Sequence, residues 1–346
     1  MRILKLMRIQ HTDDPPNAET DLAALGPDAT PLDQFYTRCN FTIPQLDVAF
    51  WTLDLSGAFD LPRAWTMDDL RDLPYVERTI TMECAGNGRT LMVPVPPGTP
   101  WKLGAVSTAR FGGVRLADLV AASGMQLSAA ELVFTGADHG EVEPDGHIPY
   151  EFNLDATTAR QDGPMLAWSM GGEPLSAEHG YPMRLVVPGH YGMRSVKWLT
   201  RIAAVDEPFA GHFPLKYRYR SERGVPEGTP VGPIRVRSLF TSPRDGARIA
   251  TEPTTLHGIA WSGSGAVHRV EVMVDGQWMP AQIGDPIDGT GHVAWAFDWA
   301  PRGAGTHDLA VRATDSAGDR QPESPVWNEG GFGNNAVHRI SVMLDG

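Results

Sequence analysis

Apolar and polar residues follow different patterns in the two parts of the chain. Up to about residue 206, strand-like alternation is mixed with short helical patterns. The first helical pattern begins at Thr66, an N-cap residue followed by early acidic residues, and the second ends at Ser123 and Gly124, a helix stop. The strand patterns include 48–55 and 78–83, and the helical patterns are 66–73 and 115–122. This mixture predicts an α+β fold.

From Ile234 onward, short period-two strand patterns dominate. Turn signals such as Asp245-Gly246 and Asp275-Gly276 separate them. Short strands at this spacing predict an antiparallel β-sandwich of the immunoglobulin-like kind. The patterns cover 234–240, 255–261, 267–274, 293–299, 306–314 and 336–343.

The remaining segments set the expected domain limits. Residues 1–32 are polar and rich in proline, which indicates a loose or wrapped N-terminal arm, with regular structure beginning near Phe35. Residues 207–233 contain five prolines and predict a connector. We therefore expect a mixed α/β catalytic domain over 33–206 and a β-sandwich over 234–346.

Composition narrows the class of protein. The 346 residues carry a formal net charge of −13, which argues against a general nucleic-acid binder. No apolar run approaches the roughly 18 residues of a membrane span. The two cysteines are too few for a disulfide scaffold, a Cys-rich zinc module or a self-contained iron–sulfur cluster. The N-terminus lacks a signal-peptide core, so we expect a cytoplasmic protein, although a mature periplasmic form beginning at an added Met would look the same.

One of the cysteines lies in an unusual segment. A strand pattern runs into Cys84, and Gly86, Asn87 and Gly88 then allow a tight turn. Such a turn would present the sulfur at the end of a strand. The residues alone are also compatible with a buried structural cysteine, or with a Cys-dependent hydrolase using His179, for which no acyl-transfer motif is present.

Longer motifs give the segment a family context. The string from Cys84 to Arg89 reads C-A-G-N-x-R, and the string from His179 to Leu199 reads H-G-x-P-x-R followed by P-G-x-x-G-x-R-x-V-K-W-L. With the segment 35–44 and the C-terminal Trp327-Asn328…Asn335…His338-Arg339, they resemble the sulfite oxidase family of molybdenum enzymes. The resemblance covers nearly the whole chain from about residue 33.

The resemblance implies one molybdenum held by a single pyranopterin dithiolene and by the thiolate of Cys84. A soft thiolate suits a metal already bound by sulfur. The pterin phosphate requires anion-binding groups. The residues implied for cofactor binding are Tyr36, Arg38, Asn40, Asp138, His179, Arg184, Ser195, Val196 and Lys197.

The resemblance also implies an oxyanion substrate held by arginines and a tyrosine. Arg38 matches the first arginine, and Tyr217 is the first candidate for the tyrosine, with Tyr219 the second. Two positions depart from the family: Asn40 replaces a histidine and Gly330 replaces the second substrate arginine. Losing one charged contact to a buried anion costs on the order of 1.5–3 kcal/mol, so sulfite is expected to bind less tightly here.

Charge is uneven along the chain. Residues 184–223 contain eight basic and three acidic residues, a net of +5 in an acidic protein. A positive segment of this kind can attract an anion toward a site. A solvated connector with no binding role would give the same count.

These observations predict a molybdopterin-dependent oxidoreductase that transfers an oxygen atom to sulfite or a related small oxyanion. The alternatives are a reductase of nitrate or of an S- or N-oxide, and a non-catalytic pterin-binding or scaffold protein. No C-x-x-C-H haem motif is present, so a separate electron carrier is expected. The resemblance of the second domain implies a homodimer.

Overall fold

The computed structural model describes residues 7–345, and the mixed α/β part contains three sheets within that range. One follows the order β1 (Ile9–Asp13), β2 (Pro16–Glu19) and β3 (Thr37–Arg38). The next has the order β11 (Glu173–Pro174), β10 (Met165–Met170), β7 (Val106–Arg115) and β6 (Tyr75–Glu83), with β12 (Arg184–Val186) beside β10. The third has the order β5 (Ala64–Trp65), β4 (Leu53–Gly57), β13 (Leu199–Val205), β8 (Glu131–Val142) and β9 (Gly146–Asp155).

Helices in this part are short. Both predicted ones are confirmed: α1 (Met67–Arg71) begins after a capping box between Thr66 and Asp69, and α2 (Leu116–Ala122) leads into Gly124 at a φ of +65°. Two helices were not predicted: α3 (Ala156–Ala159) and α4 (His212–Lys216), which lies inside the expected connector. Single 3-10 turns cover Leu22–Ala24, Arg89–Leu91, Ala177–His179, Gly192–Arg194 and Ile287–Gly289.

The C-terminal part consists of two antiparallel-rich sheets, as the alternating patterns predicted. The first has the order β14 (Arg237–Ser242), β16 (Thr254–Trp261), β20 (Val293–Trp299) and β19 (Gln282–Pro286). The second has the order β15 (Arg248–Ala250), β22 (His338–Asp345), β21 (Gly305–Asp315), β17 (Val267–Val274) and β18 (Gln277–Pro280). Buried side chains such as Leu256, Val272 and Trp295 form the core between them.

The prediction that regular structure begins near Phe35 was wrong. Strands β1 and β2 form a hairpin, and β2 pairs with β3 through Asn17 opposite Arg38. Glu19 is fully buried and accepts hydrogen bonds from the backbone N–H groups of Lys102 and Gly104. The hairpin is therefore held by polar tertiary contacts, which a search for apolar alternation does not detect.

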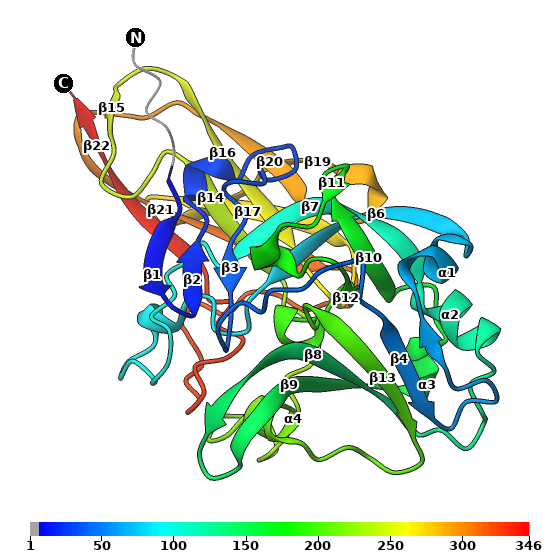
Figure 1. Cartoon of the computed structure of the whole chain (residues 1–346). Helices are drawn as coiled ribbons and strands as arrows, with labels where there is room; N and C mark the ends of the chain where they lie inside the picture. The colour runs from blue at the N-terminus through cyan, green and yellow to red at the C-terminus, as the bar shows by residue number, and fades with distance from the viewer. Residues whose placement is uncertain (1–6, 346) are drawn as a thin grey trace.

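Figure 1 shows how the parts are arranged. The C-terminal strands, coloured yellow to red, lie on one side, and β8, β9 and β13 lie on the opposite side, with β3, β10 and β12 between them. The expected strand 48–55 begins later, at Leu53, and β6 starts three residues earlier than expected. No helix in residues 7–345 is long and apolar enough to cross a membrane. Most of the N-terminal stretch behind the localisation expectation, residues 1–6, lies outside the described residues.

Candidate active site

The turn that carries Cys84 joins the end of β6 to a 3-10 turn. Asn87 N–H donates to the Cys84 carbonyl (2.9 Å), and Arg89 N–H donates to the Gly86 carbonyl (3.0 Å). Gly88 has a φ of +81°, the left-handed region that favours glycine, and a Cβ there would lie 2.7 Å from Nη2 of Arg237. The turn leaves Cys84 half-buried at a point where two cavities meet.

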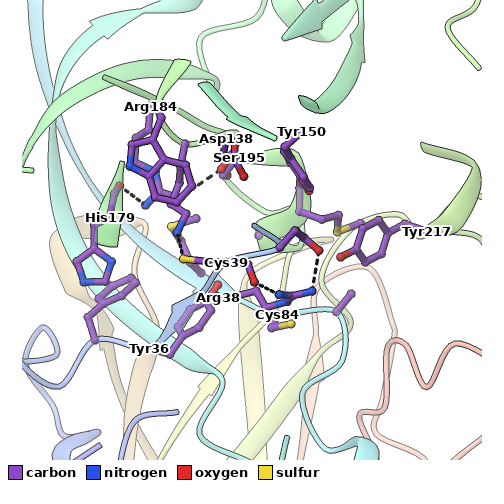
Figure 2. Close-up of a pocket in the computed structure, with 18 residues that line it drawn as sticks. Tyr36, Arg38, Cys39, Cys84, Asp138, Tyr150, His179, Arg184, Ser195 and Tyr217 are labelled. Carbon is purple, nitrogen blue, oxygen red and sulfur yellow. Dashed lines mark hydrogen bonds between the residues drawn. The ribbon is translucent and has the colours of Figure 1, made fainter. Parts of the chain in front are cut away.

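The first cavity collects the side chains that the sequence selected for cofactor binding (Figure 2). Its volume of about 60 Å³ is below the roughly 300 Å³ of a typical ligand pocket, so lining side chains must move for a pterin to enter. Val196 is the exception to the predicted set, because its side chain is fully buried in the core. The predicted residues that line the cavity are Tyr36, Arg38, Asn40, Cys84, Asp138, His179, Arg184, Ser195, Lys197 and Tyr217.

Arg184 provides a buried positive charge in this cavity. Its guanidinium donates to the carbonyls of His179 (2.9 Å) and Ser195 (3.4 Å), its Nε has no partner, and within residues 7–345 it forms no ion pair. Burial lowers its pKa to about 10, so it remains charged at neutral pH. Because a buried cation without a counter-charge is costly, this position favours an anion such as a phosphate.

Lys197 and Asp138 line the same cavity. Lys197 Nζ donates to the Glu178 carbonyl (2.7 Å) and to Cys39 Sγ (2.9 Å). Asp138 is 4% exposed and its Oδ1 has no hydrogen-bond partner, so this oxygen can accept an N–H of a bound heterocycle. Burial lowers the pKa of His179 to about 3, which keeps its imidazole neutral. These donors and acceptors fit a phosphate-bearing pterin.

The Asp138 carboxyl makes stability depend on pH. Burial raises the pKa of this carboxyl from 3.8 to about 6. The contribution of Asp138 to the free energy of unfolding is therefore fully present below about pH 4 and is lost as the pH rises through 6. We expect Asp138→Asn to raise the free energy of unfolding of the cofactor-free protein by on the order of 2 kcal/mol at pH 7.5 and to have little effect at pH 4. Urea unfolding at both values, with exposed Asp33→Asn as control, measures this. Equal effects at the two pH values would contradict it.

Arg38 lies where the two cavities meet, beside Cys84 and Tyr217 (Figure 2). Its guanidinium donates to Oδ1 of Asn40 (2.7 Å) and to Oδ1 of Asn17 (3.1 Å). Asn40 therefore holds Arg38 in place. Asn17 was not predicted as a site residue, because it lies in the unexpected strand β2.

The second cavity is wider, about 340 Å³, and its charged lining residues are five cations and one acidic residue, Glu329. Arg89 lies 6% exposed on its wall and donates to the carbonyls of Thr99 (2.7 Å) and Gly330 (3.0 Å), with no ion pair in the described part of the chain. Sequence reasoning did not select Arg89 as a site residue, although it closes the cysteine motif. The other cations that line this cavity are Arg38, Lys216, Arg218 and Arg220, so the positive segment found in the sequence contributes three of them.

The structure also shows which of the two candidate tyrosines lines the cavity and what surrounds Gly330. Tyr217 lines both cavities, whereas Tyr219 lines neither and packs under the guanidinium of Arg235 (4.7 Å). Burial raises the pKa of Tyr217, so its hydroxyl remains a donor. At Gly330, a Cβ would lie 2.2 Å from the Phe332 ring, so Phe332 occupies the space that a side chain at 330 would enter.

Comparison with known proteins identifies the group to which this chain belongs. Residues 40–213 match the oxidoreductase molybdopterin binding domain, and residues 231–345 match the Mo-co oxidoreductase dimerisation domain. Sulfite oxidase of Gallus gallus is 36% identical over 90% of this chain and 72% of its own length. The chain belongs to the sulfite oxidase family of molybdopterin-dependent oxidoreductases.

The chain is also similar to other known proteins. Human mitochondrial sulfite oxidase is 36% identical over 91% of this chain, which spans 62% of that protein's length. Barley nitrate reductase is 31% identical over 91% of this chain and 39% of its own. The crystal structure of the sulfane dehydrogenase SoxCD from Paracoccus pantotrophus superposes with a TM-score of 0.84 at 26% identity, covering 96% of this chain and 87% of that one.

Proposed function

We propose that this protein binds one molybdenum pyranopterin in the first cavity and oxidises sulfite, or a related small oxyanion, in the second. The observation that carries the proposal is the position of Cys84, because it forms part of the wall of both cavities. A metal ligand at this junction would hold the metal between the cofactor on one side and the substrate on the other. Membership of the molybdopterin oxidoreductase family supports the cofactor class.

The residues of the first cavity have separate roles in this proposal. Cys84 supplies the protein thiolate, and although burial raises the pKa of its thiol, metal binding removes the proton. Arg184 and Lys197 bind the phosphate, and Asp138 accepts a hydrogen bond from the pterin. When bound, the molybdenum cofactor supplies oxygen-atom transfer and accepts two electrons.

The residues of the second cavity bind the substrate. Arg38 and Arg89 pair with the anion, because guanidinium groups match the geometry of oxyanion oxygens. The Tyr217 hydroxyl donates to the substrate. Lys216 and Arg220, exposed at the mouth, raise the local concentration of anions.

A reductase of nitrate or of an S- or N-oxide is the second candidate. The similarity to barley nitrate reductase and the two departures at Asn40 and Gly330 support it. A non-catalytic scaffold has less support, since Arg38 and Arg89, which line the second cavity with Cys84, form no ion pair within residues 7–345. We also propose that Cys84 is the metal ligand. Because we propose no haem in this chain, a separate protein would carry the electrons.

The second part of the chain supports a homodimer, since it matches a dimerisation domain. We infer that its sandwich is immunoglobulin-like. The order β14-β16-β20-β19 and the order β15-β22-β21-β17-β18 support this, because they follow the A-B-E-D and G-F-C arrangement of that fold. The proposed limits are an arm over 1–32, a catalytic domain over 33–206, a connector over 207–233 and the sandwich over 234–346.

The function is tested with protein produced in a host that makes the molybdenum cofactor. We expect molybdenum by elemental analysis and turnover of sulfite with an artificial electron acceptor. Nitrate and S- and N-oxides are tested with a reduced dye. Turnover of only the oxidised substrates would favour the reductase, and protein without molybdenum would overturn both enzyme functions.

Gly330→Arg tests why the second substrate arginine is missing. Restoring the arginine alone should not improve sulfite binding, because the new Cβ collides with Phe332. We expect Gly330→Arg alone to raise KM for sulfite, and Gly330→Arg/Phe332→Ala to lower KM about tenfold relative to Phe332→Ala. Steady-state kinetics of the three variants measures this. An improved KM in the single variant would contradict the packing argument.

A further inference from the structure

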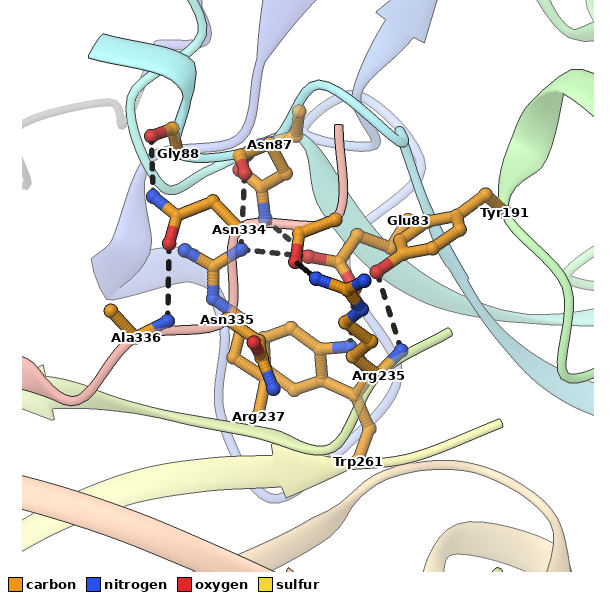
Figure 3. Close-up of polar contacts among 12 residues, drawn as sticks. Glu83, Asn87, Gly88, Tyr191, Arg235, Arg237, Trp261, Asn334, Asn335 and Ala336 are labelled. Carbon is orange, nitrogen blue, oxygen red and sulfur yellow. Dashed lines mark hydrogen bonds and ion pairs between the residues drawn. The ribbon is translucent and has the colours of Figure 1, made fainter. Parts of the chain in front are cut away.

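The C-terminal part of the chain also contacts the turn that carries Cys84 through polar groups that line neither cavity (Figure 3). Gly333 N–H donates to the Ala85 carbonyl (2.8 Å), and Asn334 Nδ2 donates to the Gly88 carbonyl (2.7 Å). Both donors belong to the region that matches the dimerisation domain. The backbone of the cysteine turn is therefore hydrogen-bonded directly by the second domain.

Glu83, the residue before Cys84, strengthens this connection. Its carboxylate is buried at 1% exposure and accepts hydrogen bonds from three side chains. Arg237 Nη1 donates to Oε1 (2.9 Å), Trp261 Nε1 to Oε2 (2.9 Å) and Asn87 Nδ2 to Oε1 (2.9 Å). Two of these three donors come from the C-terminal sandwich.

Strand register explains why the two sandwich donors arrive together. Arg237 at the start of β14 is the direct partner of Trp261 at the end of β16. The edge of the sandwich thus presents a guanidinium and an indole N–H side by side to the carboxylate (Figure 3). A cross-strand pair is a rigid support, because the ladder hydrogen bonds set the position of both residues.

Arg237 contacts both ends of the turn. It is 1% exposed, and besides its ion pair with Glu83 its Nη1 lies 3.3 Å from the Asn87 carbonyl. Glu83 precedes Cys84 by one residue and Asn87 follows it by three. Because a buried charge cannot be left without its partner at low cost, the turn cannot shift without breaking this pair.

We propose that Arg237 is a positioning residue that, through Glu83 and Asn87, sets the position of the Cys84 sulfur between the two cavities. The C-terminal sandwich then completes the active site, in addition to its proposed role in forming the homodimer. Removal of a residue that orients a metal ligand commonly lowers metal affinity or activity about 10- to 100-fold. The significance for catalysis rests on the proposed function, whereas the positioning itself does not.

The first measurement uses the cofactor-free protein, so that it does not depend on molybdenum. We expect Arg237→Met to speed hydrogen exchange of the amides of residues 84–89 roughly tenfold or more. Val272→Ala is the matched control, since Val272 is fully buried in the sandwich core and its loss destabilises the sandwich without touching the turn. Its exchange in 84–89 should stay close to that of the unchanged protein.

The second measurement uses molybdenum-loaded protein. We expect Arg237→Met to lower kcat about tenfold or more with KM changed far less, and to shift the thiolate-to-molybdenum absorption band. Arg237→Lys, which keeps the charge but has only one nitrogen, should recover part of both. If Arg237→Met does not fold, Trp261→Phe removes another donor to Glu83 and keeps an aromatic ring.

The outcomes separate the two proposals. The positioning role would be overturned if Arg237→Met and Val272→Ala lose the same free energy of unfolding and also show the same hydrogen exchange at residues 84–89 and the same kcat. Unchanged protein that takes up no molybdenum would overturn the proposed function, and the exchange measurement would still decide whether Arg237 positions the turn.

Discussion

Cys84→Ser is expected to lose oxygen-atom transfer while the pterin remains bound. The substitution removes the sulfur at the junction of the two cavities and leaves the phosphate-binding side chains, such as Arg184, in place. Removing the surrounding partners of a metal ligand commonly costs 10- to 100-fold, so loss of the ligand itself should lower kcat by more than about a hundredfold. Turnover is compared with pterin content, measured by fluorescence after oxidation, and with molybdenum content.

Cys39→Ser is the matched control for this experiment. Cys39 lines the first cavity too, and its sulfur accepts a hydrogen bond from Lys197 that a serine hydroxyl can also accept. We expect a far smaller loss of turnover from this substitution. Retained turnover in Cys84→Ser, or equal losses in the two variants, would refute the assignment of Cys84 as the ligand.

Arg89→Met is expected to have the largest effect on substrate binding. Arg89 is a buried cation on the wall of the second cavity that donates to the carbonyls of Thr99 and Gly330 and forms no ion pair in residues 7–345. Loss of a charged hydrogen bond of about 1.5–3 kcal/mol corresponds to a 10- to 100-fold rise in KM for an anion. Steady-state kinetics with sulfite, and with a neutral S-oxide if the reductase activity is present, measures this.

The choice of substrate and control isolates the effect of charge. A neutral S-oxide should be affected much less than an anion by Arg89→Met. Arg220→Met removes an exposed cation from the mouth of the same cavity, so we expect a smaller change that fades at high salt. If Arg220→Met raises KM as much as Arg89→Met, the anion is not bound against Arg89.

The parts of the fold that sequence reasoning predicted depend on neighbours close in the chain. The capping box of α1 joins Thr66 to Asp69. The end of α2 at Ala122 is followed closely by Gly124, whose positive φ stops the helix. The sandwich strands follow from alternation within each segment. In the same way, the motifs 35–44, 84–89 and 179–199, together with Asp138, selected candidate cofactor-binding residues through their resemblance to a known family, and all of these except Val196 line one cavity.

Only the tertiary structure brought in the residues that complete the site. Asn17 reaches Arg38 from a hairpin held by polar contacts, Phe332 fills the space beside Gly330, and Arg237 meets Glu83 across 154 residues of chain. Composition and periodicity carry no information on such pairings, because a buried polar residue satisfied by a distant partner looks in sequence like an exposed one. The sequence by itself therefore determined the family, the two-part architecture and most of the predicted residues that line the first cavity. Packing of one part against the other decided how the cysteine turn is held, since its partners approach only after both parts have folded.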